Sequence, residues 1–179
     1  GRVYVADANR VQVFDELGAV LDEYQANDPA RTIRRLECGP GNLGFASNDL
    51  AQVVRFRRVG DVEAGASTLN LSTPYSSADD APGFFRQPVD LAAGPNSNMY
   101  IADAGNFRVQ KFSPQGDLQN GFGSEATGHG EFSRMIALDA GTAFGQFRVS
   151  VLDDTGTEYR IQRFDNQLSF VDQITLPSG

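Results

Sequence analysis

The sequence predicts an all-β protein made of repeated small sheets. Nineteen glycines and eight prolines among 179 residues supply the tight turns that separate short strands. A strand pattern that ends in phenylalanine occurs four times along the chain. A chain of this length buries one sizeable core, so we expect a single domain over residues 1–179.

The spacing of the repeated strand indicates the architecture. The copies are VQVF at 11–14, VVRF at 53–56, VQKF at 109–112 and IQRF at 161–164. They follow one another at intervals of 42, 56 and 52 residues. Repeats of about 40 to 50 residues with four short strands each are typical of the blades of a β-propeller.

Each copy predicts one blade. The clearest one predicts strands at 88–93, 98–102, 108–113 and 117–122. The first copy has no room for its first strand, and the last has an expanded turn between its first two strands. We expect blades at about 1–25, 30–67, 84–124 and 131–177, with an inter-blade insertion at about 66–83.

Two segments between Phe84 and Asp139, MYIADAGNFRVQKF and GFGSEATGHGEF, resemble the hairpin and the connector of NHL repeats. The resemblance implies a β-propeller of NHL type, commonly with six radial blades. About four four-stranded blades would be present here, the first incomplete, as part of a larger six-bladed propeller. The alternative is a compact four-bladed ring, in which the strand near Phe170 to Leu176 completes a sheet with the first blade.

Several recurring residues have structural interpretations. Asp7, Asp103 and Asp153 end the second strand of their copies, and we expect them to bond backbone amides of the turn that follows. Ser47 is expected at this position in the second copy. Gly105 and Asn106 are expected to supply positive φ angles in the third hairpin. The inter-blade core is expected to contain four phenylalanines: Phe14, Phe56, Phe112 and Phe164.

A cluster of arginines makes the second copy unlike the others and is the candidate partner-contact face. Its members are Arg31, Arg34, Arg35, Arg55, Arg57 and Arg58. Guanidinium groups on one rim could bind a carboxylate-rich partner through paired hydrogen bonds. The alternative is pairing with the many acidic residues of the same chain.

The sequence predicts no catalytic, metal-binding or cofactor-binding residues. It contains no nucleophile elbow, phosphate-binding glycine loop or histidine triad. His129, the single histidine, lies between glycines and is interpreted as a loop residue rather than a metal ligand. Cys38, the single cysteine, is interpreted as a small packed residue. The repeated aspartates could in principle serve calcium, but turn capping is the favoured interpretation.

These features favour a non-catalytic protein-interaction or scaffolding module. The alternative is a fragment of a propeller enzyme, a metal-dependent lyase or a lactonase-like hydrolase, with its active-site residues mostly outside this chain. A formal charge of −8 disfavours nucleic acid as a partner, and no segment is apolar enough to span a membrane. Exposed blade edges predict other subunits or self-association. The resemblance to bacterial NHL-like proteins, together with the acidic composition, implies an extracellular, periplasmic or cell-surface setting.

Overall fold

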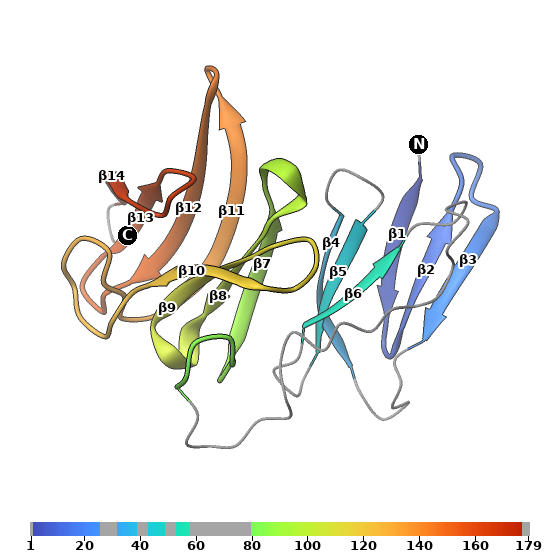
Figure 1. Cartoon of the computed structure of the whole chain (residues 1–179), viewed down its shortest axis with the longest axis horizontal. Coiled ribbons are helices and arrows are strands. Elements are labelled where there is room, and N and C mark those ends of the chain that lie inside the picture. The colour runs from blue at the N-terminus through green and yellow to red at the C-terminus, as the bar shows by residue number, and fades with distance from the viewer. Residues whose placement is uncertain (1, 26–31, 39–42, 49–52, 58–79, 177–179) are drawn as a thin grey trace.

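The computed structural model describes residues 2–25, 32–38, 43–48, 53–57 and 80–176, and these residues form four antiparallel sheets (Figure 1). The first sheet contains β1 (Val3–Asp7), β2 (Arg10–Phe14) and β3 (Val20–Gln25). The second contains β4 (Ile33–Cys38), β5 (Leu43–Asn48) and β6 (Val53–Arg57). Each of these two sheets has three described strands.

The other two sheets have four strands each. The third contains β7 (Pro88–Ala93), β8 (Met99–Asp103), β9 (Arg108–Phe112) and β10 (Leu118–Phe122). The fourth contains β11 (Met135–Ala143), β12 (Gln146–Asp154), β13 (Tyr159–Phe164) and β14 (Phe170–Leu176). Two short 3-10 turns, η1 (Pro95–Ser97) and η2 (Ala104–Asn106), flank β8. The strands predicted for the third copy agree with these bounds to within one residue.

Packing between successive sheets forms the core. The largest cluster joins the third and fourth sheets and includes Tyr100, Val109, Phe132, Val151 and Phe164. A second cluster covers the other face of the third sheet, and a third joins the first sheet to the second through Val11 and Ala46. Apolar residues on both faces of one sheet are what a sheet stacked between two neighbours requires.

The strand register repeats from sheet to sheet. Asp7 pairs with Arg10, Asp103 with Arg108 and Asp153 with Arg160. β4, β7 and β11, the first strands of the other three sheets, each contain a register shift just after their first residue pair. These first pairs are Ile33 with Asn48, Pro88 with Asp103 and Met135 with Asp153. Asn48 therefore takes the aspartate position of the second sheet, and the expectation for Ser47 was wrong by one residue.

The four sheets do not close on themselves. The first sheet and the fourth lie at opposite ends of the described structure (Figure 1). Within the described strands β14 pairs with β13 and β1 pairs with β2, so no strand joins the two ends. The four-bladed ring is therefore wrong, and the arrangement is that of a partial propeller.

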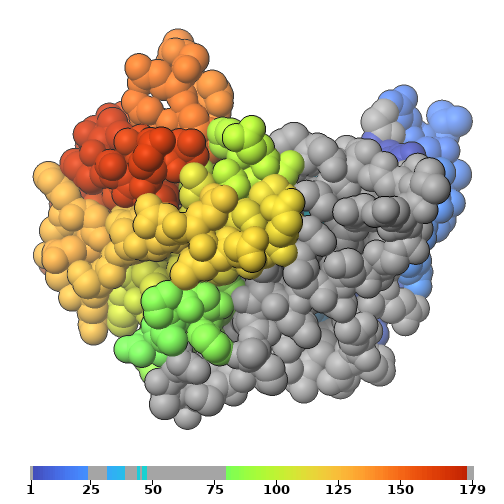
Figure 2. Space-filling model, viewed as in Figure 1, coloured from blue at the N-terminus to red at the C-terminus, as the bar shows by residue number. Residues whose placement is uncertain are grey.

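The connection between β11 and β12 also differs from expectation. The sequence predicted an expanded turn, but both strands are nine residues long and the turn is only Phe144 and Gly145. Both turn residues have positive φ, 51° and 74°, as the tight hairpin turn that matches strand twist requires. The extra residues lengthen the hairpin, which projects beyond the neighbouring sheets (Figures 1 and 2).

Candidate functional site

A buried polar network lies on one face of the fourth sheet. Oδ1 of Asp153 accepts the backbone N–H groups of Ser133 and Arg134 at 3.0 and 2.8 Å. Its Oδ2 accepts two hydrogen bonds from Arg160, which also donates to backbone carbonyls of the connector, including that of Glu131 at 2.8 Å. Asp153 and Arg160 are both almost wholly buried, so this pair fixes the connector against the sheet.

The third sheet contains the same network. Asp103 accepts the N–H groups of Arg86 and Gln87 at 2.9 and 3.1 Å, and Arg108 donates to the carbonyl of Phe84 at 2.7 Å. Gln110 in this sheet and Gln162 in the fourth each bond one amide and one carbonyl of their connector. The repeated aspartate, arginine and glutamine therefore hold the connector backbone against each sheet.

The hydrogen bonds correct the expected turn chemistry. Asp103 accepts amides from the connector before its sheet, not from the turn after β8, although the Asn106 side chain does donate to it at 2.7 Å. The positive φ of this turn belongs to Phe107, at 52°, and not to Gly105 or Asn106. At Gly105 a Cβ would lie 2.7 Å from the Arg86 side chain, so close packing explains the glycine.

The phenylalanines predicted for the inter-blade core lie in different surroundings. Phe112 and Phe164 are buried, and the Phe164 ring lies 4.5 Å from that of Phe122 in the third sheet. Phe14 is half-buried on the outer face of the first sheet. Phe56 takes the same register position as Phe112, and its side chain lies outside the described residues.

The arginine cluster is not assembled by the described residues. Arg34 and Arg35 lie on β4, where Arg35 forms an ion pair with Asp90 of the third sheet at 3.4 Å. Arg55 and Arg57 lie on β6, but their side chains are outside the described residues, as are Arg31 and Arg58 altogether. The one pair seen joins neighbouring sheets, as the alternative interpretation supposed.

Acidic side chains gather where the first strands of three sheets meet. Glu37 of β4 lies near Asp90 of β7 and Asp139 of β11. Burial raises the pKa of Glu37, the two aspartates raise it further, and a hydrogen bond from the Ala93 backbone opposes the rise. Within the described ranges no group of three or more His, Cys, Asp or Glu residues could hold a metal ion.

The single histidine and cysteine have separate environments. The His129 ring stacks on Phe170, with 4.1 Å between ring centres and 8° between planes. Cys38 ends β4, is half-buried and forms no disulfide. The described part of the chain contains no helix of the length and apolar character that a membrane crossing needs.

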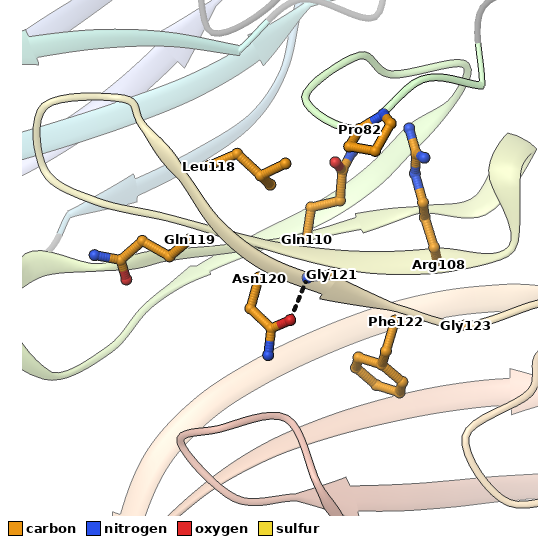
Figure 3. Close-up of a pocket in the computed structure, with 9 residues that line it drawn as sticks. All are labelled: Pro82, Arg108, Gln110, Leu118, Gln119, Asn120, Gly121, Phe122 and Gly123. Carbon is orange, nitrogen blue, oxygen red and sulfur yellow. Dashed lines mark hydrogen bonds between the residues drawn. The ribbon is translucent and has the colours of Figure 1, made fainter.

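A groove runs between β10 and the connector of the third sheet, with a volume of about 360 Å³. Figure 3 shows Arg108 and Gln110 directed toward Pro82, and Asn120 bonded to the Gly121 amide at 2.9 Å. The side chains of Arg108 and Gln110 already donate hydrogen bonds to the connector backbone. The groove therefore marks where the connector packs against its own sheet.

The tip of the β11–β12 hairpin is the most exposed apolar feature of the described surface. Phe144 is 106% exposed relative to a reference residue, and its backbone has a left-handed φ of 51°. A bulky residue is unfavourable in this conformation. The tip, residues 141–146, carries no charge in a chain of formal charge −8. Exposure and a left-handed backbone are therefore combined at one aromatic residue of the tip.

The base of this hairpin is firmly packed. Val149 and Val151 are buried in the core shared with the third sheet. The Phe147 ring lies 5.7 Å from that of Tyr100, and both rings occupy space that a Cβ at Gly94 would fill. The base of the hairpin that carries Phe144 is therefore packed against the third sheet.

Comparison with known proteins agrees with the architecture. Residues 85–112 match the NHL repeat family model. No curated protein matches the sequence. Among solved structures, virginiamycin B lyase from Staphylococcus aureus is similar over 100% of this chain and 53% of its own, with a TM-score of 0.67 and 14% identity.

Two other solved structures are similar at comparable levels. BBS1N in complex with ARL6DN matches 98% of this chain and 50% of its own, with a TM-score of 0.69 and 12% identity. Regucalcin, a calcium-binding protein from Agrobacterium tumefaciens, matches 96% and 56%, with a TM-score of 0.61 and 11% identity. The chain spans about half the length of these proteins, and the likeness establishes the fold alone.

The fold and the repeated connector network define a partial β-propeller. Residues 85–112 match the NHL repeat model, and the similar structures establish a β-propeller fold for the chain. The similar structures include both an enzyme and a complex with a protein, so fold does not choose between catalysis and binding.

Sequence reasoning missed the hairpin tip. The segment AGTAFGQF contains a Phe-Gly dipeptide between two long runs of strand-forming residues. A hairpin turn of two residues was therefore readable, but an aromatic at its first position is not a recognised turn signal. Its exposure became visible only in the structure.

Proposed function

We propose that this chain is a non-catalytic protein-interaction module that contacts its partner through the β11–β12 hairpin, within a propeller domain spanning residues 1–179. The observation that carries the proposal is the fully exposed Phe144 on a packed support. The uncharged tip suits an apolar pocket on a protein partner, because no charge has to be desolvated on contact.

The energy available from this contact is substantial. Burying a phenylalanine side chain stabilises a complex by about 1.5–3 kcal/mol. Every 1.4 kcal/mol changes affinity about tenfold, so Phe144→Ala is expected to weaken binding by roughly 10- to 100-fold. Packing of the hairpin base against the third sheet favours affinity, since that part of the hairpin does not have to become ordered on binding.

Site-specific photo-crosslinking tests the proposal. A photoreactive phenylalanine analogue at position 144 should yield one reproducible protein adduct. The same analogue at Leu17, an exposed residue in the β2–β3 turn of the first sheet, should not. The purified partner should then bind the parent chain at least tenfold more tightly than Phe144→Ala. Identical adducts at positions 144 and 17 would contradict the proposal. Equal affinities of the partner for the parent chain and for Phe144→Ala would contradict it as well.

A fragment of a propeller enzyme is the second candidate, supported by the likeness to virginiamycin B lyase along the whole chain. One of the similar structures contains that lyase with quinupristin. Incubating the chain with quinupristin and following the product by mass spectrometry tests this candidate. Turnover that is abolished by substitution of a residue in this chain would favour the enzyme over the interaction module.

A further inference from the structure

The hairpin formed by β11 and β12 has one strand edge that faces away from its own sheet. Among the described strands β11 pairs only with β12, in a sheet that has four strands. The amide of Leu138 donates to Asp90 of the third sheet at 2.9 Å, so the outer edge of β11 is occupied at this residue. Alternate residues of a strand direct their backbone groups to the same edge. Ala140 and Thr142 therefore direct theirs to the same side as Leu138.

Beyond Leu138 this edge becomes accessible. Leu138 is buried, whereas Gly141, Thr142 and Ala143 are exposed. This part of the hairpin extends past the neighbouring sheets (Figures 1 and 2). Among the described residues, none forms a hydrogen bond with the outward N–H or C=O of Ala140 or Thr142. The backbone of the projecting segment is thus left to solvent on one side.

The accessible edge lacks the usual protection against strand pairing. Proteins commonly protect such edges with charges, prolines or bulges. The outer strands β10 and β14 follow this rule, since the ladder of each contains a register shift. Residues 140–147 carry no charge and no proline in a chain of formal charge −8, and the register shift of β11 lies earlier, between Met135 and Ala137. An unprotected edge of this kind is a template for another strand.

The edge is complementary to a second copy of itself. An antiparallel pair of β11 strands, related by a two-fold axis at Gly141, places Ala140 opposite Thr142 on both sides of the axis. Because both residues direct backbone groups outward, each such pair can exchange both of its N–H···O=C bonds. No atom lies within 4 Å of a Cβ built at Gly141, so the space at the axis is open. Asp139 would lie opposite the uncharged Ala143, and no like charges would meet.

We propose that two copies of this chain associate through the β11 edges of their projecting hairpins, by antiparallel pairing centred on Gly141. The inference rests on the proposed function and names a second copy as the partner of the hairpin. Antiparallel pairing places the two propellers at opposite ends of the joined hairpins and brings each Phe144 level with Leu138 of the partner subunit. The paired segment is short, and small interfaces are weak, so the dimer exchanges with monomer.

Sedimentation measures this association. In analytical ultracentrifugation the parent chain should show a monomer–dimer equilibrium at concentrations up to about 1 mM. Thr142→Pro removes an outward N–H while it leaves the hydrogen bonds between β11 and β12 in place, and should weaken dimerisation at least tenfold. Thr142→Val keeps the amide and the branched side chain, and is the control that should dimerise like the parent.

Cysteine cross-linking tests the register. In a Cys38→Ala background, which removes the native cysteine, Gly141→Cys should form a disulfide-linked dimer on mild oxidation. Directly opposite residues that share no hydrogen bond have Cα atoms about 4.5 Å apart, which is within the range of a disulfide. Ala143→Cys is the matched control, because the proposed register separates its two copies by several residues. Thr142→Pro should abolish the cross-link at position 141.

The outcomes separate this inference from the proposed function. A chain that sediments as a monomer throughout, a dimer that Thr142→Pro leaves unchanged, or equal cross-linking at positions 141 and 143 would overturn the pairing. An adduct from position 144 to a different protein, with a monomeric chain, would overturn it and leave the proposed function standing. A dimer that is lost in Thr142→Pro and retained in Phe144→Ala would support the pairing and count against Phe144 as the contact.

Discussion

The Arg160 guanidinium donates two hydrogen bonds to Oδ2 of Asp153, at 3.1 and 2.8 Å, and the two side chains are 2% and 0% exposed. The same pair recurs as Arg108 with Asp103, and again as Arg10 with Asp7. Only the last pair lies at the surface. One repeated pair therefore occurs in two environments, which allows its contribution to be measured by matched substitutions.

Removal of the buried arginine is expected to be costly. Arg160→Ala leaves the Asp153 carboxylate buried without its cationic partner and leaves connector carbonyls without donors. Breaking a buried ion pair in this way typically costs about 3–5 kcal/mol. Urea denaturation followed by circular dichroism should show this loss.

The exposed counterpart is the control. Arg10→Ala removes the equivalent pair where water can solvate Asp7, so the unfolding midpoint should hardly change. Equal losses for the two variants would contradict the argument that burial makes the Arg160–Asp153 pair the more important one.

A second prediction concerns Gly123, which follows β10. Its φ is 125°, and a Cβ there would lie 2.4 Å from the Phe107 carbonyl oxygen and 2.8 Å from the Cα of Arg108. Backbone atoms cannot move aside as a flexible side chain does, and the strained φ alone costs about 1–3 kcal/mol. Gly123→Ala should therefore lower thermal stability clearly in calorimetry.

Gly141 is the matched position for this experiment. A Cβ at Gly141 would meet nothing within 4 Å, and its φ is not in the left-handed region. Gly141→Ala should leave the melting temperature unchanged or slightly raised, because alanine restricts the unfolded chain. A similar loss at both sites would contradict the steric explanation.

Phenylalanine periodicity and turn composition were enough to predict the four sheets, because both record packing that each blade needs locally. Strand bounds in the third copy were close for the same reason. The aspartate contacts were assigned to the wrong segment, since a carboxylate at a strand end has amides available both before and after it in the chain. The aspartate position of the second sheet was assigned to Ser47 instead of Asn48 because strand register is set by pairing with the neighbouring strands, which the sequence alone does not show.

The candidate contact site was hardly predictable. The arginine cluster attracted attention because its charge departs from the rest of the chain, yet Arg35 is paired with Asp90 of the neighbouring sheet. Phe144 looked like one more apolar residue of a strand-rich segment. Its significance depends on hairpin length and exposure, which arise from tertiary structure.

Phe144→Asn should raise stability while it lowers binding. Asn-Gly is a preferred pair for the two positive-φ positions of such a turn, whereas an ordinary side chain there costs about 1 kcal/mol or more. The variant should unfold at a higher urea concentration than the parent. In the same variant the partner captured at position 144 should bind at least tenfold more weakly. A loss of stability would show that Phe144 serves the fold and not a contact.

The acidic side chains of β4, β7 and β11 predict that the folding stability depends on pH. Burial raises the pKa of Glu37 above its ordinary value of 4.5, and the nearby aspartates raise it further. The folded state therefore holds this proton more tightly than the unfolded chain, and ionisation at higher pH costs folding free energy. Glu37→Gln removes that cost and retains an oxygen for the Ala93 amide.

The variant should be more stable than the parent at pH 7. Its advantage should shrink as pH falls through the raised pKa of Glu37, and should vanish below about 4.5, where both states of the parent are protonated. Melting temperatures at half-unit pH intervals measure this difference. Glu125→Gln, on a carboxylate outside the three first strands, is the control and should show no such trend. An advantage that grew toward acid pH would mean that Glu37 is stabilised as the carboxylate, contrary to the burial argument.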